Sequence, residues 1–198
     1  MAIRPDISDK VIHFTKGATV EDAIGVLLTI IGEGRLLGGG RMIRGGYRCV
    51  CFTEAPLPAL AGGLVNGGSF TRYSPCGLMF EKSWLYDRSA RPVIYQPDAE
   101  FGQLPEEIRW RHVRYEPTGN PPIDFAWERE RRLRQDELQF SPDDAVLVVP
   151  DREWEAFIFE IWNAQQELEA EAYSAIFDHA IVEQLQEPCP WRIVTLAP

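Results

Sequence analysis

Several features are scarce or missing in this chain, and each absence excludes a class of protein. No run approaches the ~20 consecutive apolar residues of a membrane span, and Met1 to Lys10 are polar rather than of signal-peptide form. The 20 lysines and arginines are outnumbered by 30 acidic residues, so the net charge is −10. The protein therefore lacks the overall positive potential with which many proteins bind nucleic acid. These patterns predict a cytoplasmic protein that does not enter a membrane.

Motifs for metal binding are also missing. The three histidines have no HExxH spacing, and the four cysteines include no CxxC pair, so no metal is expected. Cys49 and Cys51 are two residues apart and would lie on the same face of a strand, which is poor geometry for a mutual disulfide. Free thiols in a reducing cytosol are the expectation.

What is present indicates an ordinary globular domain. The chain has 198 residues, of which 45% are hydrophobic and 11% aromatic, enough for a sizeable core. No repeat or linker divides it, so one domain over residues 1–198 is expected. Strands are predicted at 11–15, 47–53, 77–82, 92–95, 145–149 and 191–196. They do not alternate regularly with helices, which favours an α+β fold over a doubly wound sheet.

The helix signals lie near the two ends of the chain. Thr19, with an acidic residue three positions later, starts an amphipathic pattern as a variant capping box, and glycines 32 and 34 are expected to end it. Asp151 is expected to cap a helical region with two apolar stripes. The acidic segment 167–171 between these stripes predicts either a solvated face or a turn between two helices.

The stretch from Asp124 to Arg134 combines two glutamates with a dense run of arginines. If it is extended, Glu128, Glu130 and Arg132 share one face. Adjacent carboxylates on one face repel unless cations or a polar ligand compensate. The pattern therefore predicts a catalytic strand, and a surface helix with salt bridges is the alternative.

Two further segments contain candidate ligand-binding residues. His13 lies in a β-prone run with Thr15 on the same face, although a lone histidine on a strand is more often a satisfied core residue. Arg41 and Arg44 stand between glycines 38–40 and 45–46. This loop is similar in composition to a phosphate-cradling loop, but it lacks the established phosphate-binding motifs, and a mobile loop is the simpler interpretation.

In their order along the chain, these motifs resemble a known family. The members of the pattern are His13-Phe14-Thr15, the strand from Val50 to Glu54, Tyr73, the strand from Gly77 to Phe80, Val93-Ile94-Tyr95, and Trp127-Glu128-x-Glu130-x-Arg132. Their order resembles that of bacterial ADP-ribosyltransferase-like domains. The pattern is most similar to DarT-type toxins and to uncharacterised bacterial domains linked to phage resistance. The resemblance implies a split, mixed β-sheet with flanking helices and with NAD between its halves.

The resemblance also implies roles for individual residues. His13 would contact the nicotinamide-side ribose, Phe14 and Thr15 would lie beside it, and Tyr73 would stack on nicotinamide. Glu130 would be the catalytic residue that binds the ribose 2′-hydroxyl, with Glu128 as its helper.

The expected cofactor and partners follow from the same resemblance. Arg41, Arg44 and Arg91 are unranked candidates to hold the NAD pyrophosphate. The acceptor would be a macromolecule, either nucleic acid or protein, and an antitoxin or regulatory protein is a possible partner. The alternative is a non-catalytic binding domain in which the Glu/Arg stretch forms a structural ion-pair network, and a nuclease is a third, weaker option.

Overall fold

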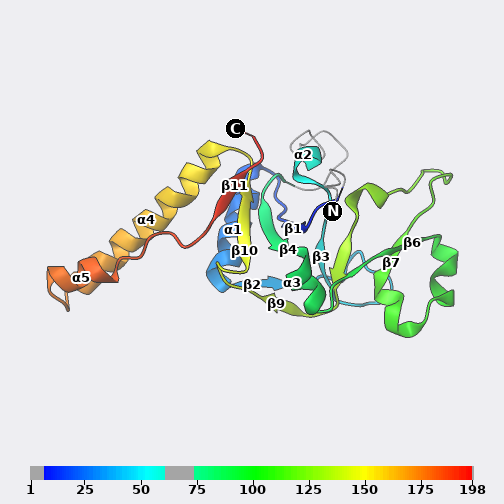
Figure 1. The fold of residues 1–198 in the computed structure, drawn as a ribbon, viewed down its shortest axis with the longest axis horizontal. Coiled ribbons are helices and arrows are strands. Elements are labelled where there is room, and N and C mark those ends of the chain that lie inside the picture. Colours follow the sequence, from blue (N-terminus) through cyan, green and yellow to red (C-terminus); the bar gives the residue numbers. More distant parts are fainter. Residues whose placement is uncertain (1–6, 61–73, 198) are drawn as a thin grey trace, which may run out of the picture.

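The computed structural model describes residues 7–60 and 74–197 and has an α+β fold (Figure 1). The strands are β1 (Lys10–Phe14), β2 (Arg35–Leu37), β3 (Val50–Phe52), β4 (Gly77–Glu81), β5 (Arg91–Pro92), β6 (Ile94–Gln96), β7 (His112–Arg114), β8 (Arg131–Leu133), β9 (Glu137–Gln139), β10 (Ala145–Val149) and β11 (Ile193–Thr195). The α-helices are α1 (Val20–Glu33), α2 (Leu57–Ala59), α3 (Lys82–Asp87), α4 (Arg152–Ser174) and α5 (His179–Leu185). The 3-10 helices are η2 (Asp98–Gln103), η3 (Glu106–Arg111) and η4 (Ala126–Glu128). The predicted α+β class is confirmed.

Two sheets matter for the candidate site. The larger has the order β1-β4-β10-β11, with antiparallel pairs except for the parallel β10–β11 pair. The second has the order β3-β8-β5 and is antiparallel. Ile12 and Thr53 exchange main-chain hydrogen bonds of 2.9 and 2.8 Å. This bridge joins β1 to the end of β3 and therefore brings the first strand against the sheet that contains β8.

The first helix forms as its sequence predicts. The Thr19 hydroxyl accepts from the Asp22 amide, and the Asp22 carboxylate accepts from the Thr19 amide, each at 3.1 Å. The helix continues through residue 32 and ends at Gly34, whose φ of 64° is left-handed and favours glycine. Its buried side chains pack into the main apolar core, together with residues of β4, β8 and β10.

A second apolar cluster covers the other face of the large sheet. It contains Ile12, Phe14, Met79 and Val148, whereas Val11, Leu78 and Leu147 belong to the main core. Alternation along each strand explains the division, since successive side chains point to opposite faces.

Some predicted elements differ from the observed ones. The segment 92–95 is divided between two short strands, because β5 pairs with β8 whereas β6, from Ile94 onward, pairs with β7. The short β2–β9 pair was not predicted, and three-residue strands carry little periodic signal. The turn considered for 167–171 is wrong, because α4 is continuous from residue 152 to residue 174.

Helices α4 and α5 project to one side of the molecule, away from the sheets (Figure 1). The chain returns from α5 along α4 to β11, and the Trp162 indole donates to the Glu187 carbonyl at 3.0 Å along this return. Among the helices in the described ranges, none is both long and apolar enough to cross a membrane.

Candidate active site

The charge-dense stretch is not one continuous strand. Residues 126–128 form η4, which the Asp124 carboxylate helps to start by accepting from the Ala126 amide at 2.9 Å. Arg129 has a φ of 47°, and this left-handed residue turns the chain into β8. The expected strand is therefore correct for 131–133 and wrong for 126–128, and the alternative of a surface helix is wrong as well.

Glu130 and Arg132 form a nearly buried ion pair at the start of β8. Arg132 Nε donates to Glu130 Oε1 at 2.8 Å, and Nη2 lies 3.3 Å from Oε2. Arg132 is 4% exposed, and the Glu130 side chain is 13% exposed. Arg132 Nη1 also donates to the Trp110 and His112 carbonyls, each at 2.9 Å. The guanidinium thus fixes the carboxylate with respect to η3 and β7.

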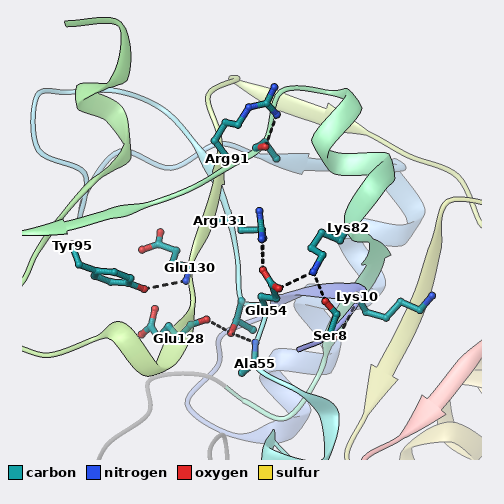
Figure 2. A network of polar contacts seen from close by, with 12 residues as sticks. Ser8, Lys10, Glu54, Ala55, Lys82, Arg91, Tyr95, Glu128, Glu130 and Arg131 are labelled. Carbon is teal, nitrogen blue, oxygen red and sulfur yellow. Dashed lines mark hydrogen bonds and ion pairs between the residues drawn. The ribbon is translucent and has the colours of Figure 1, made fainter. Parts of the chain in front are cut away.

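Tyr95 holds the main chain at Glu130. Its hydroxyl accepts from the Glu130 amide at 3.1 Å (Figure 2). The same hydroxyl donates to the Phe125 carbonyl at 3.2 Å. Burial raises the pKa of Tyr95 to about 12, so the hydroxyl keeps its proton at neutral pH. The phenol therefore ties the two ends of the η4 turn together.

Glu128 occupies an unfavourable site for a negative charge. Burial, followed by the charge of Glu130, raises the pKa of Glu128 to about 7, although Lys16 and Arg132 oppose the shift. The Thr53 hydroxyl donates to the Glu128 carbonyl at 2.5 Å, so β3 positions η4. Glu128 and Glu130 lie near one another in Figure 2, as their electrostatic coupling requires.

His13 is anchored to the neighbouring strand. Its Nδ1 lies 2.8 Å from the Cys51 carbonyl, and because a carbonyl only accepts, Nδ1 carries the proton. Its ring meets Phe52 edge-on, with centroids 5.9 Å apart. Burial lowers the pKa of His13, and the positive charge of Lys16 adds to this effect, whereas the hydrogen bond to Cys51 opposes it. The imidazole is thus neutral at pH 7, with Nε2 as an acceptor.

Cys51 connects the first-strand histidine to the late glutamate. Its carbonyl accepts from His13, and its register partner across the sheet is Arg132, which binds the Glu130 carboxylate. Burial and then the charge of Glu130 raise the pKa of Cys51 far above its usual range. The thiol therefore keeps its proton at neutral pH and is not a nucleophile.

The other predicted cofactor residues of the first strand have different surroundings. Phe14 is buried in the apolar cluster with Met79, on the opposite face of β1 from Val11. The Thr15 hydroxyl donates to the Cys76 carbonyl at 3.0 Å and is 3% exposed. Tyr73 lies outside the described residues. Binding roles for these three residues stay predictions.

The two loop arginines are also placed by the structure. Arg44 pairs with Asp98 at 2.5 Å and lies over the Phe101 ring, 4.4 Å from its centroid. Both partners belong to η2. Arg41 is exposed on the same loop. The structure brings neither arginine into contact with Glu130 through a recorded interaction, and their role in binding a pyrophosphate stays a prediction.

The sequence interpretation missed a buried polar network beside β8. Glu54 is 9% exposed and accepts from Lys82 Nζ at 2.8 Å and from Arg131 Nε at 2.5 Å. Figure 2 shows this network on the opposite side of β8 from Glu130. The alternation of Glu130, Arg131 and Arg132 divides their ion pairs between two faces. The only available signal was the position of Glu54 directly after an apolar strand.

No family model matches this chain, and the comparisons with curated proteins and with solved structures likewise find no match. Within residues 7–60 and 74–197, no group of three or more histidine, cysteine, aspartate or glutamate side chains could hold a metal ion. The site is therefore interpreted from its own geometry.

Proposed function

We propose that this protein is an NAD-dependent ADP-ribosyltransferase that modifies a macromolecule, either nucleic acid or protein. The observation that supports the proposal best is the meeting of His13 and Glu130 at Cys51. These residues come from opposite ends of the family-like motif pattern. Cys51 hydrogen-bonds His13 and is the register partner of Arg132, which binds Glu130. The bridge between β1 and β3 also agrees with a sheet divided into two halves.

In the proposed reaction, the bond between nicotinamide and ribose breaks and the acceptor atom bonds to the anomeric carbon. Nicotinamide leaves with the bonding electrons, and the acceptor gives up one proton. Positive charge develops on the ribose during this step, and a fixed carboxylate stabilises it. Glu130 is held on both sides, by Arg132 on its carboxylate and by Tyr95 on its amide, so it is preorganised for this role.

Glu128 has the properties of the base that takes the acceptor proton. A base works best when its pKa lies near the working pH, and the pKa of Glu128 is about 7. Transfer to an acceptor should therefore increase as the pH rises through about 7. The neutral His13, with its Nε2 acceptor, would accept a hydrogen bond from a ribose hydroxyl.

The proposal is tested with labelled NAD and extract of a bacterial host. Wild-type protein is expected to release nicotinamide and label a macromolecule, and nuclease or protease digestion of the product identifies its class. Glu130→Gln is expected to lose both activities, while Glu21→Gln, an exposed change on α1, keeps them. Full activity of a folded Glu130→Gln protein would overturn the assignment.

Glu128→Gln separates the two steps without removing the ion pair of Glu130. It is expected to abolish transfer while some nicotinamide release to water continues, and the pH dependence near 7 should disappear. Equal activity of Glu128→Gln and wild-type protein on the acceptor would contradict the role of Glu128.

A toxin or phage-defence effector is the biological role that the resemblance suggests. Induced expression of the wild-type chain in a bacterium should then arrest growth, whereas Glu130→Gln should not. An antitoxin or regulatory protein would counteract the wild-type chain in the same assay.

A non-catalytic binding domain is the second candidate, and one observation favours it. Both oxygens of Glu130 lie within hydrogen-bonding distance of Arg132, as in a purely structural ion pair. Isothermal titration with NAD distinguishes the two candidates. Saturable binding that His13→Ala weakens supports the transferase, and the absence of any heat of binding supports the binding domain.

A further inference from the structure

The projecting arm formed by α4 and α5 carries almost all of the net charge of the protein. Between residues 151 and 187 there are ten acidic residues and one arginine, which gives a net charge of −9 out of −10 for the chain. The remaining residues hold twenty acidic and nineteen basic side chains. The acidity is therefore a property of the arm and not of the region around Glu130.

The arm also exposes large apolar side chains. Ile158 is the buried residue of α4, at 2% exposure, and fixes the base of the arm in the main core. By contrast, Leu168 is 68% exposed. The exposed apolar side chains of the arm are Phe157, Phe159, Leu168, Tyr173, Ile176, Phe177, Ile181 and Leu185. So many large exposed apolar side chains on one arm indicate an interaction site.

Two of these residues, Phe157 and Leu168, belong to a stripe of α4 that helical spacing separates from the buried face. Phe157, Ile161, Ala164 and Leu168 recur at intervals of four, three and four residues, the spacing of a helix face that packs on another helix. Ile161 is half-buried and the other three are exposed. The stripe is thus accessible in the described part of the chain.

An acidic row borders this stripe. Glu153, Glu160 and Glu167 repeat at intervals of seven residues, and Glu171 follows four residues after Glu167. On a helix this row runs parallel to the apolar stripe and beside it, since residues separated by seven lie on one side. All four side chains are exposed, and none of them is paired with a cation in the recorded salt bridges of the described residues.

We propose that the apolar stripe and acidic row of α4 dock a protein helix that carries an apolar stripe flanked by lysine or arginine. Apolar packing supplies affinity, and opposite charges along the rim determine register and partner choice. A second copy of this chain would place one acidic row against another, and an anionic lipid surface would also repel the arm. Charge complementarity therefore selects a basic amphipathic helix. The proposal is independent of NAD chemistry.

The direct test uses a fluorescent synthetic peptide of about three heptads with leucine at the packing positions and lysine beside them. Fluorescence anisotropy is expected to show saturable binding to the full chain, weakened by added salt. A peptide with glutamate in place of lysine should bind at least about tenfold more weakly. No binding of the lysine peptide, or equal binding of the two peptides, would overturn the proposal.

Two pairs of variants locate the surface. Leu168→Ser is expected to weaken binding of the lysine peptide about fivefold or more, whereas Met42→Ser, at an equally exposed apolar side chain on a distant loop, leaves it unchanged. Replacing both Glu160 and Glu167 by lysine should weaken binding of the lysine peptide and strengthen binding of the glutamate peptide. Glu169→Lys, on the α5 side of α4, is the control for a charge change alone.

Sedimentation equilibrium decides between a heterologous partner and self-association. A monomeric wild-type chain agrees with the proposal. A dimer that Leu168→Ser converts to a monomer would assign the stripe to a second copy and overturn it. Circular dichroism of each variant verifies that α4 remains folded.

Discussion

The body of the molecule and its projecting arm use charged residues in opposite ways. In the body, Glu130 and Glu54 are nearly buried, and each binds a partner guanidinium. In the arm, the row that includes Glu160 is exposed beside apolar side chains. Buried charges are tolerated only with partners that compensate for lost hydration, whereas exposed charges can remain available for a partner. The charged residues of the body therefore hold the candidate active site in place, whereas those of the arm remain available to bind a partner.

The position of the acidic residues decides what the net charge implies for the acceptor. A charge of −10 spread over the whole protein would disfavour an anionic acceptor, but −9 of it lies in residues 151–187. The Debye length at physiological salt is about 8 Å, so the charges along a projecting arm are largely screened from a distant site. The overall charge therefore does not argue against a nucleic-acid acceptor for the proposed transferase.

The largest expected effect comes from Arg132→Met. The change leaves Glu130 nearly buried without a cation and removes donors from two main-chain carbonyls, so it should cost about 4 kcal/mol of unfolding free energy. Urea denaturation measures the cost. Arg134→Met, which removes an exposed guanidinium above Tyr47, is the control and should cost less than about 1 kcal/mol. Similar costs for both variants would contradict the distinction between buried and exposed charges.

The next effect concerns the base of the arm. Ile158→Ala removes a buried side chain from the main core and should cost about 3 kcal/mol. Leu168→Ala, further along the same helix, should change stability by less than about 0.5 kcal/mol. Thermal unfolding by circular dichroism compares the two, and a large cost at Leu168 would mean that its side chain is packed rather than free to dock.

A pH effect of about 2 kcal/mol is expected from Glu128, less than the full pKa shift would give, because the side chain is only half-buried and water screens its charge. Because its folded pKa, about 7, lies above the unfolded value, the native chain holds a proton that the unfolded chain releases. Its contribution to stability is therefore fully present below about pH 4.5 and is lost as the pH rises through 7. Glu128→Gln should remove this dependence, so the difference in unfolding free energy between variant and wild type should grow with pH. A constant difference would contradict the raised pKa.

The smallest effect is expected from a glutamine substitution in the arm. Glu160→Gln should change the unfolding free energy by less than about 0.5 kcal/mol. The same substitution at Glu54 leaves Lys82 and Arg131 without their shared carboxylate and should cost about 3 kcal/mol. Parallel urea titrations of the two variants make the comparison, and equal costs would show that the acidic row is not a free surface.

Much of the local structure could be predicted from the sequence. The capping box at Thr19, the cap at Asp151 and the apolar run of β10 all appear as expected. Each depends on interactions within a few residues or on strong periodicity. The continuity of α4 across its acidic segment was left open, because exposed glutamates fit both a helix and a turn.

The candidate site could be predicted only in part. The importance of Glu128 and Glu130 was proposed from their spacing, but the 3-10 turn that separates them depends on contacts from Thr53 and Tyr95. Those contacts join segments far apart in the chain. Cys51, which hydrogen-bonds His13 and pairs in register with Arg132, has a place in the sequence prediction only as part of the strand from Val50 to Glu54.

Residue type and local spacing are enough to predict most helices and strands, to single out the two glutamates between arginines, and to identify the acidic row with its seven-residue repeat. Tertiary structure alone decided which charges are buried. The arginines at 131 and 132 are neighbours, yet one binds Glu54 and the other Glu130 on opposite sides of β8. Pairing with β3 and contacts with η3 and β7 determine which glutamate each arginine binds. Only the assembled sheet removes these side chains from water, whereas the glutamates of α4 remain exposed to it.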